Sequence, residues 1–137
     1  MRLTSSQLLD KVKQGIEEVS VEQVNRGLQA GEALHLIDVR ERGEVLDGYI
    51  AQAQLIPRGF LEMNVEDDVT MDRNARIVLY CAGGNRSALA VRDLMAMGYT
   101  QVSSMVRGFK AWKNSVFTIS SSPTKPKICT ASVFPFT

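Results

Sequence analysis

The chain has 137 residues, of which 45% are hydrophobic and 23% are charged, and its formal net charge is +1. These are ordinary proportions for one globular domain, and they exclude a mainly disordered chain, a collagen-like repeat and a disulfide-dense mini-protein. No apolar run approaches the roughly 18–20 residues that span a bilayer, and the near-neutral charge favours neither nucleic acid nor a membrane surface as partner. Segment 1–20 lacks the continuous apolar stretch of a signal peptide, so we expect a cytoplasmic protein.

Cysteine and histidine are scarce in this chain. It holds two cysteines, Cys81 and Cys129, and one histidine, His35. A structural zinc site normally needs four such ligands in short paired spacings, so we expect no metal centre, and we expect no cofactor. His35 lies in an apolar run, which favours a strand histidine over a catalytic base. Cys129 is interpreted as a bystander thiol; a disulfide between the two cysteines stays open, although a reducing cytoplasm disfavours it.

Helices and strands alternate in the first half of the chain. An amphipathic pattern predicts a helix from Ser5 to about Ile16. Ser20 and Gln23 have the capping-box spacing, which predicts a second helix that ends near Gly31. The elements expected next are a strand at 34–39, a short acidic helix or turn at 41–47, a strand at 53–56 and one or two helical turns at 58–65.

The second half continues the alternation. Segments 66–68 and 71–74 are polar and resemble loops. The clearest strand spans 76–80, because it is continuous, β-branched and aromatic, as buried parallel strands tend to be. The remaining elements are a helix that begins at Ser87 and ends at Gly98, a strand at 101–106 and a helix at 108–113. This order predicts an α/β sandwich on a mostly parallel sheet of about five strands flanked by helices.

The composition changes from Asn114 onward. Residues 1–93 carry 11 basic and 15 acidic residues (−4), whereas residues 94–137 carry 5 basic and no acidic residues (+5). We therefore divide the chain into an N-terminal helix at 1–17, a domain at 18–113 and a tail at 114–137. Two interpretations of the tail stay open. It is either a poorly ordered basic extension, or its apolar stretches at 116–119 and 133–134 dock on this copy or on a second one, which would give a homodimer.

Cys81 follows the clearest strand and precedes a helix. In open α/β sheets this edge is where ligands bind, and a glycine-rich turn into a helix directs several N–H groups to one point. Gly83 and Gly84 allow a tight turn. The helix N-terminus and Arg86 both favour negative charge, so we expect the pKa of the Cys81 thiol to be lowered. The alternative is a buried structural cysteine beside an ordinary turn.

Residues 81–87, Cys-Ala-Gly-Gly-Asn-Arg-Ser, resemble the C-x-x-G-x-R-S active-site loop of the rhodanese-like sulfurtransferase family. Three further stretches fit the family in the same order. They are residues 36–40, residues 48–53 followed by 56–57, and residues 98–99 followed by 108–112. Together they cover roughly residues 18–113, and the resemblance implies the family's three-layer sandwich. It also implies that Cys81 is catalytic and that the loop cradles an anion or persulfide through Ala82, Gly83, Gly84, Asn85, Arg86 and Ser87.

The resemblance also suggests supporting residues. Asp38 and the Ser87 hydroxyl would help to fix the loop. Arg40, Arg58 and Arg86 are candidates for attracting an anionic donor, and Arg86 is expected mainly to brace the loop. The alternative for Arg40 and Arg58 is a solvated surface charge.

The sequence departs from the family in two places. Tyr49 and Ala51-Gln52 replace a usual His and Pro-Gly, which we expect to alter only local turn geometry. Arg107 stands where the family commonly has the first of two glycines, and it adds a charge that we expect near the site.

The reaction implied is transfer of a sulfane sulfur from a small donor, thiosulfate or a persulfide, to cyanide or a thiol acceptor through a persulfide on Cys81. The alternative is a relay or regulatory module that passes sulfur to a protein partner. A phosphatase or arsenate reductase is disfavoured, because those related folds have a C-x5-R loop and this chain has the tighter C-x4-R spacing between Cys81 and Arg86.

Overall fold

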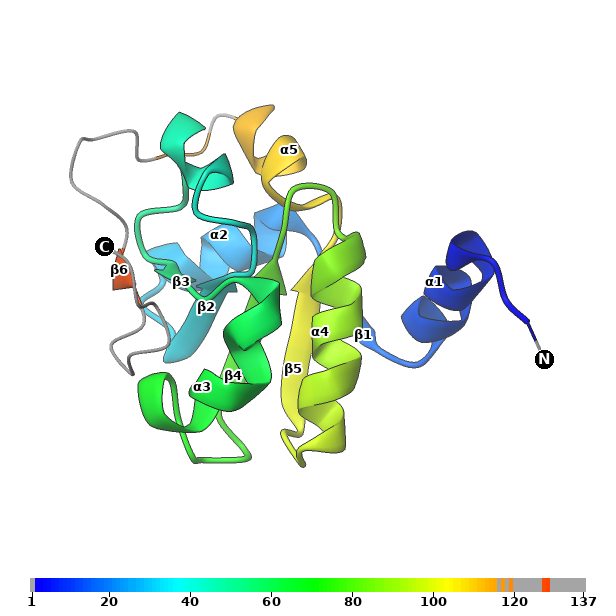
Figure 1. Ribbon diagram of the computed structural model, residues 1–137. Helices are drawn as coiled ribbons and strands as arrows, with labels where there is room; N and C mark the ends of the chain where they lie inside the picture. The colour runs from blue at the N-terminus through cyan, green and yellow to red at the C-terminus, as the bar shows by residue number, and fades with distance from the viewer. Residues whose placement is uncertain (1, 116, 118, 120–126, 129–137) are drawn as a thin grey trace.

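The computed structural model describes residues 2–115, 117, 119 and 127–128. Within these residues no helix combines the length and apolar character needed to cross a membrane. A single sheet of parallel strands runs through the molecule, with helices on both of its faces (Figure 1). This confirms the α/β sandwich that the alternating sequence pattern predicts.

Within the described residues the sheet has six strands in the order β1-β5-β4-β2-β3-β6, and all of their pairings are parallel. The sequence indicates the middle four but misses both edge strands, because these are too short to show a pattern and β1 has two exposed glutamates. The strands are β1 (Glu17–Val19), β2 (Leu34–Asp38), β3 (Gln54–Leu55), β4 (Arg76–Tyr80), β5 (Gln101–Met105) and β6 (Lys127–Ile128).

The described part of the chain also contains five α-helices and two 3-10 turns, and all but the N-terminal α1 lie between strands or after β5. Thr4 and Ser20 each close a capping box at the start of a helix, as the sequence predicts for Ser20. The helices are α1 (Ser5–Gln14), α2 (Val21–Gln29), α3 (Leu61–Asp68), α4 (Asn85–Ala96) and α5 (Gly108–Lys113), and the 3-10 turns are η1 (Glu44–Asp47) and η2 (Arg58–Phe60).

Two of these boundaries correct the sequence-based expectations. Segment 66–68 was expected to be a loop, but it forms the last turn of α3. The buried Leu61 and Val65 hold α3 against the core, and acidic residues on its solvent side do not interrupt it. The helix expected from Ser87 begins two residues earlier at Asn85, because Gly84 has a left-handed backbone and serves as its N-cap.

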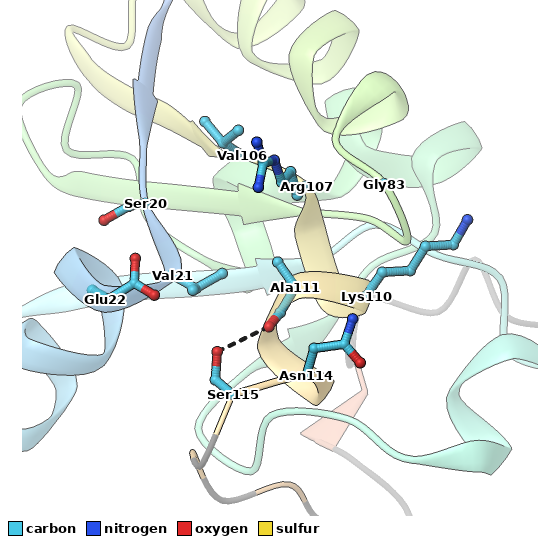
Figure 2. Close-up of a pocket in the computed structure, with 10 residues that line it drawn as sticks. All are labelled: Ser20, Val21, Glu22, Gly83, Val106, Arg107, Lys110, Ala111, Asn114 and Ser115. Carbon is cyan, nitrogen blue, oxygen red and sulfur yellow. Dashed lines mark hydrogen bonds between the residues drawn. The ribbon is translucent and has the colours of Figure 1, made fainter.

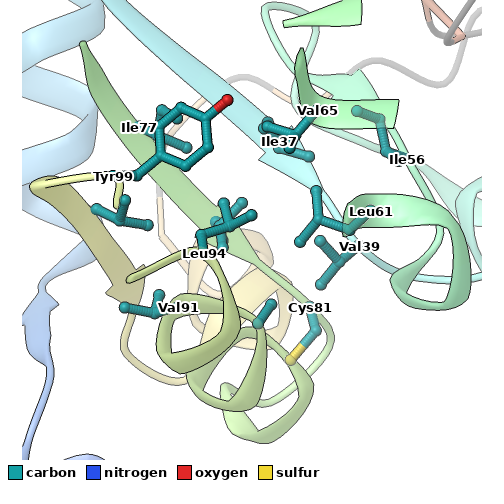
Figure 3. Packing of buried hydrophobic residues seen from close by; sticks show 13 residues of the cluster. Ile37, Val39, Ile56, Leu61, Val65, Ile77, Cys81, Val91, Leu94 and Tyr99 are labelled. Atoms are coloured by element: carbon teal, nitrogen blue, oxygen red, sulfur yellow. The ribbon is translucent and has the colours of Figure 1, made fainter. Parts of the chain in front are cut away.

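β4 determines where Cys81 lies. Successive side chains of a strand point to opposite faces, so Ile77 and Leu79 join the core layer under α3 and α4, and Val78 and Tyr80 join the layer under α2 and α5. Cys81 continues the first set and packs in the same layer (Figure 3). The strand pattern therefore turns Cys81 toward the N-terminal end of α4.

The tail is described only in part. Phe117 packs on Trp112 of α5, with ring centroids 5.0 Å apart. Cys129 and segment 133–134 lie outside the described residues, and the homodimer through the tail stays a prediction.

Candidate active site

Cys81 lies at the carboxyl end of β4, where ligands bind in parallel sheets. Its side chain is 1% exposed and packs near Val39 and Val91 in the core layer under α4 (Figure 3). The side chain is therefore almost entirely shielded from solvent.

Hydrogen bonds from the loop converge on the Cys81 sulfur. The backbone N–H of Gly84 donates to Sγ at 3.1 Å, and the N–H of Ser87 donates at 3.5 Å. The Ser87 hydroxyl also lies 3.5 Å from Sγ. Burial raises the pKa of the Cys81 thiol, but the hydrogen bonds from Ser87, Gly84 and Gly83 outweigh it and lower the pKa below its ordinary value. The loop thus favours a thiolate, as expected from the sequence.

A second serine holds the Ser87 hydroxyl in place. Ser104 of β5 lies 2.8 Å from Ser87, oxygen to oxygen, and both side chains are fully buried. The strand register pairs Ser104 with Leu79 of β4, two residues before the cysteine. Sequence reasoning missed Ser104; its only signal was a pair of serines, Ser103 and Ser104, in a buried strand.

α5 fixes the backbone of the loop. The N–H of Phe109 donates to the carbonyl of Cys81 at 2.8 Å, and the N–H of Lys110 donates to the carbonyl of Ala82 at 3.0 Å. A trans peptide unit points its C=O and N–H in opposite directions. Because the Ala82 carbonyl faces α5, the N–H of Gly83 faces the other way, toward the sulfur. The contact with α5 therefore orients the N–H of Gly83, one of the donors that lower the pKa of Cys81.

Glycine is required at two positions around this contact, Gly84 and Gly108. Gly108 has φ +53°, and a Cβ on it would overlap the Cys81 carbonyl and lie 2.9 Å from the Ala82 carbonyl carbon. Gly84 has φ +102°, and a Cβ there would lie 3.1 Å from the backbone nitrogen of Arg107. A Cβ on Gly83 would meet nothing within 4 Å, so the expected need for glycine applies to Gly84 and not to Gly83.

Arg86 is held by Glu44 of η1, a residue that sequence reasoning missed. The guanidinium donates to the two oxygens of the Glu44 carboxylate at 2.7 and 2.9 Å. This pairing, chiefly the hydrogen bond from Arg86, lowers the pKa of Glu44 to about 2. It also raises the pKa of Arg86, to which the charge of Cys81 adds a smaller contribution. Arg86 therefore braces the loop against η1, consistent with the bracing role suggested by the sequence.

Arg40 and Asp38 form a buried ion pair. Nε and Nη2 of Arg40 donate to the Asp38 carboxylate at 2.8–3.1 Å, and Nη2 also donates to the Gly48 carbonyl at 2.9 Å. The guanidinium carbon of Arg40 lies 4.3 Å from the centre of the Phe109 ring. With only 4% of Arg40 exposed, neither a solvated surface charge nor a free anion attractor describes it. Asp38 holds the Arg40 guanidinium, and Arg40 in turn braces segment 44–48 through the Gly48 carbonyl.

Arg58 is also engaged by carboxylates. Its guanidinium pairs with Glu62 of α3 at 2.8 Å and with Asp93 of α4. Arg58 therefore ties η2 to two helices, and its charge is balanced within the protein.

No group of three or more His, Cys, Asp or Glu side chains that could hold a metal ion occurs among the described residues. His35 is half-buried in β2 and pairs in register with Ile77 of β4.

Comparison with known proteins identifies the family of this chain. A sequence model of the rhodanese-like domain matches residues 20–115 of this chain. The chain belongs to the single-domain rhodanese-like sulfurtransferase family. YtwF of Bacillus subtilis (strain 168) is 34% identical over 112 residues, covering 82% of this chain and 97% of YtwF. Thiosulfate sulfurtransferase GlpE of Pseudomonas fluorescens (strain SBW25) is 27% identical over 81 residues, covering 58% of this chain and 71% of GlpE.

A solved structure agrees with this rhodanese-like fold. A Rhodopseudomonas palustris CGA009 protein of unknown function, described as a possible tyrosine phosphatase, superposes with a TM-score of 0.78 at 26% identity. The match covers 88% of this chain and 96% of that one.

The residues that depart from the rhodanese-like pattern lie in a small buried cluster and in two turns. Tyr49 is buried against Val45 and Leu55 in a small cluster, and Ala51 and Gln52 lie in an exposed turn. Arg107 has φ +62°, a left-handed conformation that glycine adopts freely and other residues rarely do. The backbone at Arg107 thus keeps the shape of a glycine turn although its side chain is long and charged.

Proposed function

We propose that this rhodanese-like sulfurtransferase moves a sulfane sulfur from a small donor such as thiosulfate to a thiol or cyanide, through a persulfide on Cys81. The observation that carries the proposal is the set of loop N–H groups aimed at Sγ, which lower the pKa of Cys81 and match the charge of a thiolate or persulfide. The name of the relative GlpE includes thiosulfate, which supports this donor.

The first step is an attack by the Cys81 thiolate on the outer sulfur of thiosulfate. A new S–S bond forms at Sγ, the S–S bond of thiosulfate breaks, and sulfite leaves with the electron pair. The persulfide anion then rests among the N–H groups of residues 82–87. Splitting one transfer into two steps through a covalent intermediate predicts ping-pong kinetics.

The second step returns the enzyme to its starting state. Cyanide or an acceptor thiolate attacks the outer sulfur of the persulfide, and the electron pair of the S–S bond returns to Sγ. No proton donor is needed on Sγ, because the lowered pKa of Cys81 makes the thiolate a good leaving group. This is consistent with a site that holds no histidine. A reducing cytoplasm, as expected from the sequence, would keep the thiol available.

A small donor suits this site better than a phosphoryl group. The backbone N–H groups of Gly84 and Ser87 and the Ser87 hydroxyl already lie within 3.5 Å of Sγ. The loop therefore surrounds Sγ closely and suits one added sulfur atom better than a larger group. A protein thiol as acceptor is the alternative for the second step; its sign would be slow turnover with cyanide and fast transfer to the partner.

Steady-state kinetics with thiosulfate and cyanide test the proposal. We expect parallel double-reciprocal lines for the unchanged protein, loss of turnover in Cys81→Ser, and normal turnover in the matched control Cys129→Ser. Turnover that survives Cys81→Ser, or hydrolysis of an aryl phosphate that depends on Cys81, would contradict it.

A further inference from the structure

A groove lies beside the catalytic loop, between the start of α2 and the short helix α5 (Figure 2). Its volume is about 670 Å³, which is within the range of about 300–1,000 Å³ typical of small-molecule sites. Arg107 and Lys110 line one side, and Glu22 of α2 lies across from them. Gly83 of the catalytic loop borders the same groove.

The two cationic side chains of this groove, Arg107 and Lys110, differ in their ion pairing from the arginines described above. Arg40, Arg58 and Arg86 each pair with a carboxylate. Neither Arg107 nor Lys110 forms an ion pair within the part of the chain that the structure describes, and both side chains are exposed. Among the described residues that line the groove, Glu22 is the only carboxylate, so their formal charge is +1. Arg107 and Lys110 are therefore available to bind an anion. The charges of Arg40, Arg58 and Arg86 are already balanced by carboxylates of the protein.

Gly83 belongs both to the groove and to the loop around Cys81. It is exposed, an added Cβ would meet nothing within 4 Å, and its N–H is one of the donors that lower the pKa of Cys81. A molecule in the groove therefore lies against the same loop that holds the sulfur. An anion as small as thiosulfate would fill only a small part of this volume.

We infer that this groove binds the anionic part of a small acceptor thiol, with Arg107 and Lys110 as specificity-determining residues for the second half of the reaction. The inference rests on the proposed function, because it names the class of acceptor for the same persulfide. The acceptor thiolate attacks the outer sulfur of the Cys81 persulfide and forms a new S–S bond. The bond to Sγ breaks with its electron pair on Cys81, so the acceptor leaves as a persulfide.

The test separates the two half-reactions. The protein is loaded with thiosulfate, freed of excess donor, and mixed in single turnovers with mercaptosuccinate, a dianionic thiol, or 2-mercaptoethanol, a neutral one. The variants are Arg107→Gly, which suits the left-handed backbone at this position, and Lys110→Gln. The matched control is Lys113→Gln, which removes the same charge from α5 at a residue that does not line the groove. Lys113 and Lys110 both line a second cavity that borders Ala82, so an effect that arises in that cavity would appear in both variants.

We expect each groove variant to slow transfer to mercaptosuccinate by about tenfold, and added salt to weaken the effect. Transfer to 2-mercaptoethanol and persulfide formation from thiosulfate should change less than about twofold, as should all rates of Lys113→Gln. Equal slowing of both thiols, equal slowing in Lys113→Gln, or slowing of the donor step alone would overturn the inference. If the unchanged protein forms no persulfide, the proposed function itself fails.

Discussion

Gly108 lies against the carbonyl group of Cys81, so close that even the smallest side chain would overlap its oxygen. The next residue, Phe109, donates its N–H to that oxygen at 2.8 Å. The turn into α5 thus sets the position of Cys81 through its backbone carbonyl.

Gly108→Ala should therefore displace the loop and slow sulfur transfer. A shift of about 1 Å in a reacting group can cost about 100-fold in rate, and we expect a loss of kcat/KM of about that size. Steady-state kinetics together with thermal unfolding check it. Gly43→Ala is the control, because a Cβ at Gly43 meets nothing within 4 Å and its φ is ordinary. Equal activity of the two variants would contradict the role given to Gly108.

The two glycines of the loop should respond differently to alanine. Gly84 has φ +102° and lies against the Arg107 backbone, whereas Gly83 is in open space. We expect Gly84→Ala to destabilise the protein by about 1–3 kcal/mol, because alanine is strained in that conformation. Gly83→Ala should change the free energy of unfolding by less than about 1 kcal/mol. Urea denaturation measures both, and similar losses would show that the loop backbone has been described wrongly.

The difference between these glycines shows what a sequence can and cannot reveal. The pattern of residues 76–80 predicts a buried strand and places Cys81 at its end, because a short, continuous run of β-branched and aromatic residues is typical of a buried parallel strand. The identity of Gly83 and Gly84 shows a turn, but only the backbone shows which of them has a positive φ. Glu44 and Ser104 could not be found as partners of the loop, since their contacts depend on how distant segments pack.

The Ser87 hydroxyl should control the titration of Cys81. Its hydrogen bond helps to lower the pKa of the thiol, so Ser87→Ala should raise that pKa and move the pH dependence of persulfide formation to higher pH. Ser104→Ala removes the group that orients this hydroxyl and should shift the profile in the same direction, but less.

Ser103→Ala is the matched control for these serines. Its hydroxyl is buried and has no hydrogen-bond partner within the described residues. Removing it should leave the pH profile unchanged and stabilise the protein by about 1 kcal/mol, because an unsatisfied buried group is lost. A profile that moves equally in Ser103→Ala and Ser87→Ala would refute the specific role of Ser87.

The ion pair between Glu44 and Arg86 should make stability depend on pH. The pKa of Glu44 falls from 4.5 to about 2 in the folded protein. A lowered carboxyl pKa contributes stability that is complete above the unfolded pKa and is lost as the pH falls through the folded one. Glu44→Gln should therefore be less stable than the unchanged protein above about pH 5, with the gap closing toward pH 2. Denaturation curves across this range test it; a gap that stays constant with pH would exclude the ion pair as its source.

The most direct test of the persulfide mechanism is a mass measurement on the protein before and after treatment with thiosulfate, followed by peptide mapping. We predict a mass increase of one sulfur atom on Cys81, its removal by cyanide, and its absence from Cys81→Ser. A protein that gains no sulfur, or an adduct that maps to Cys129 and persists in Cys81→Ser, would contradict the mechanism.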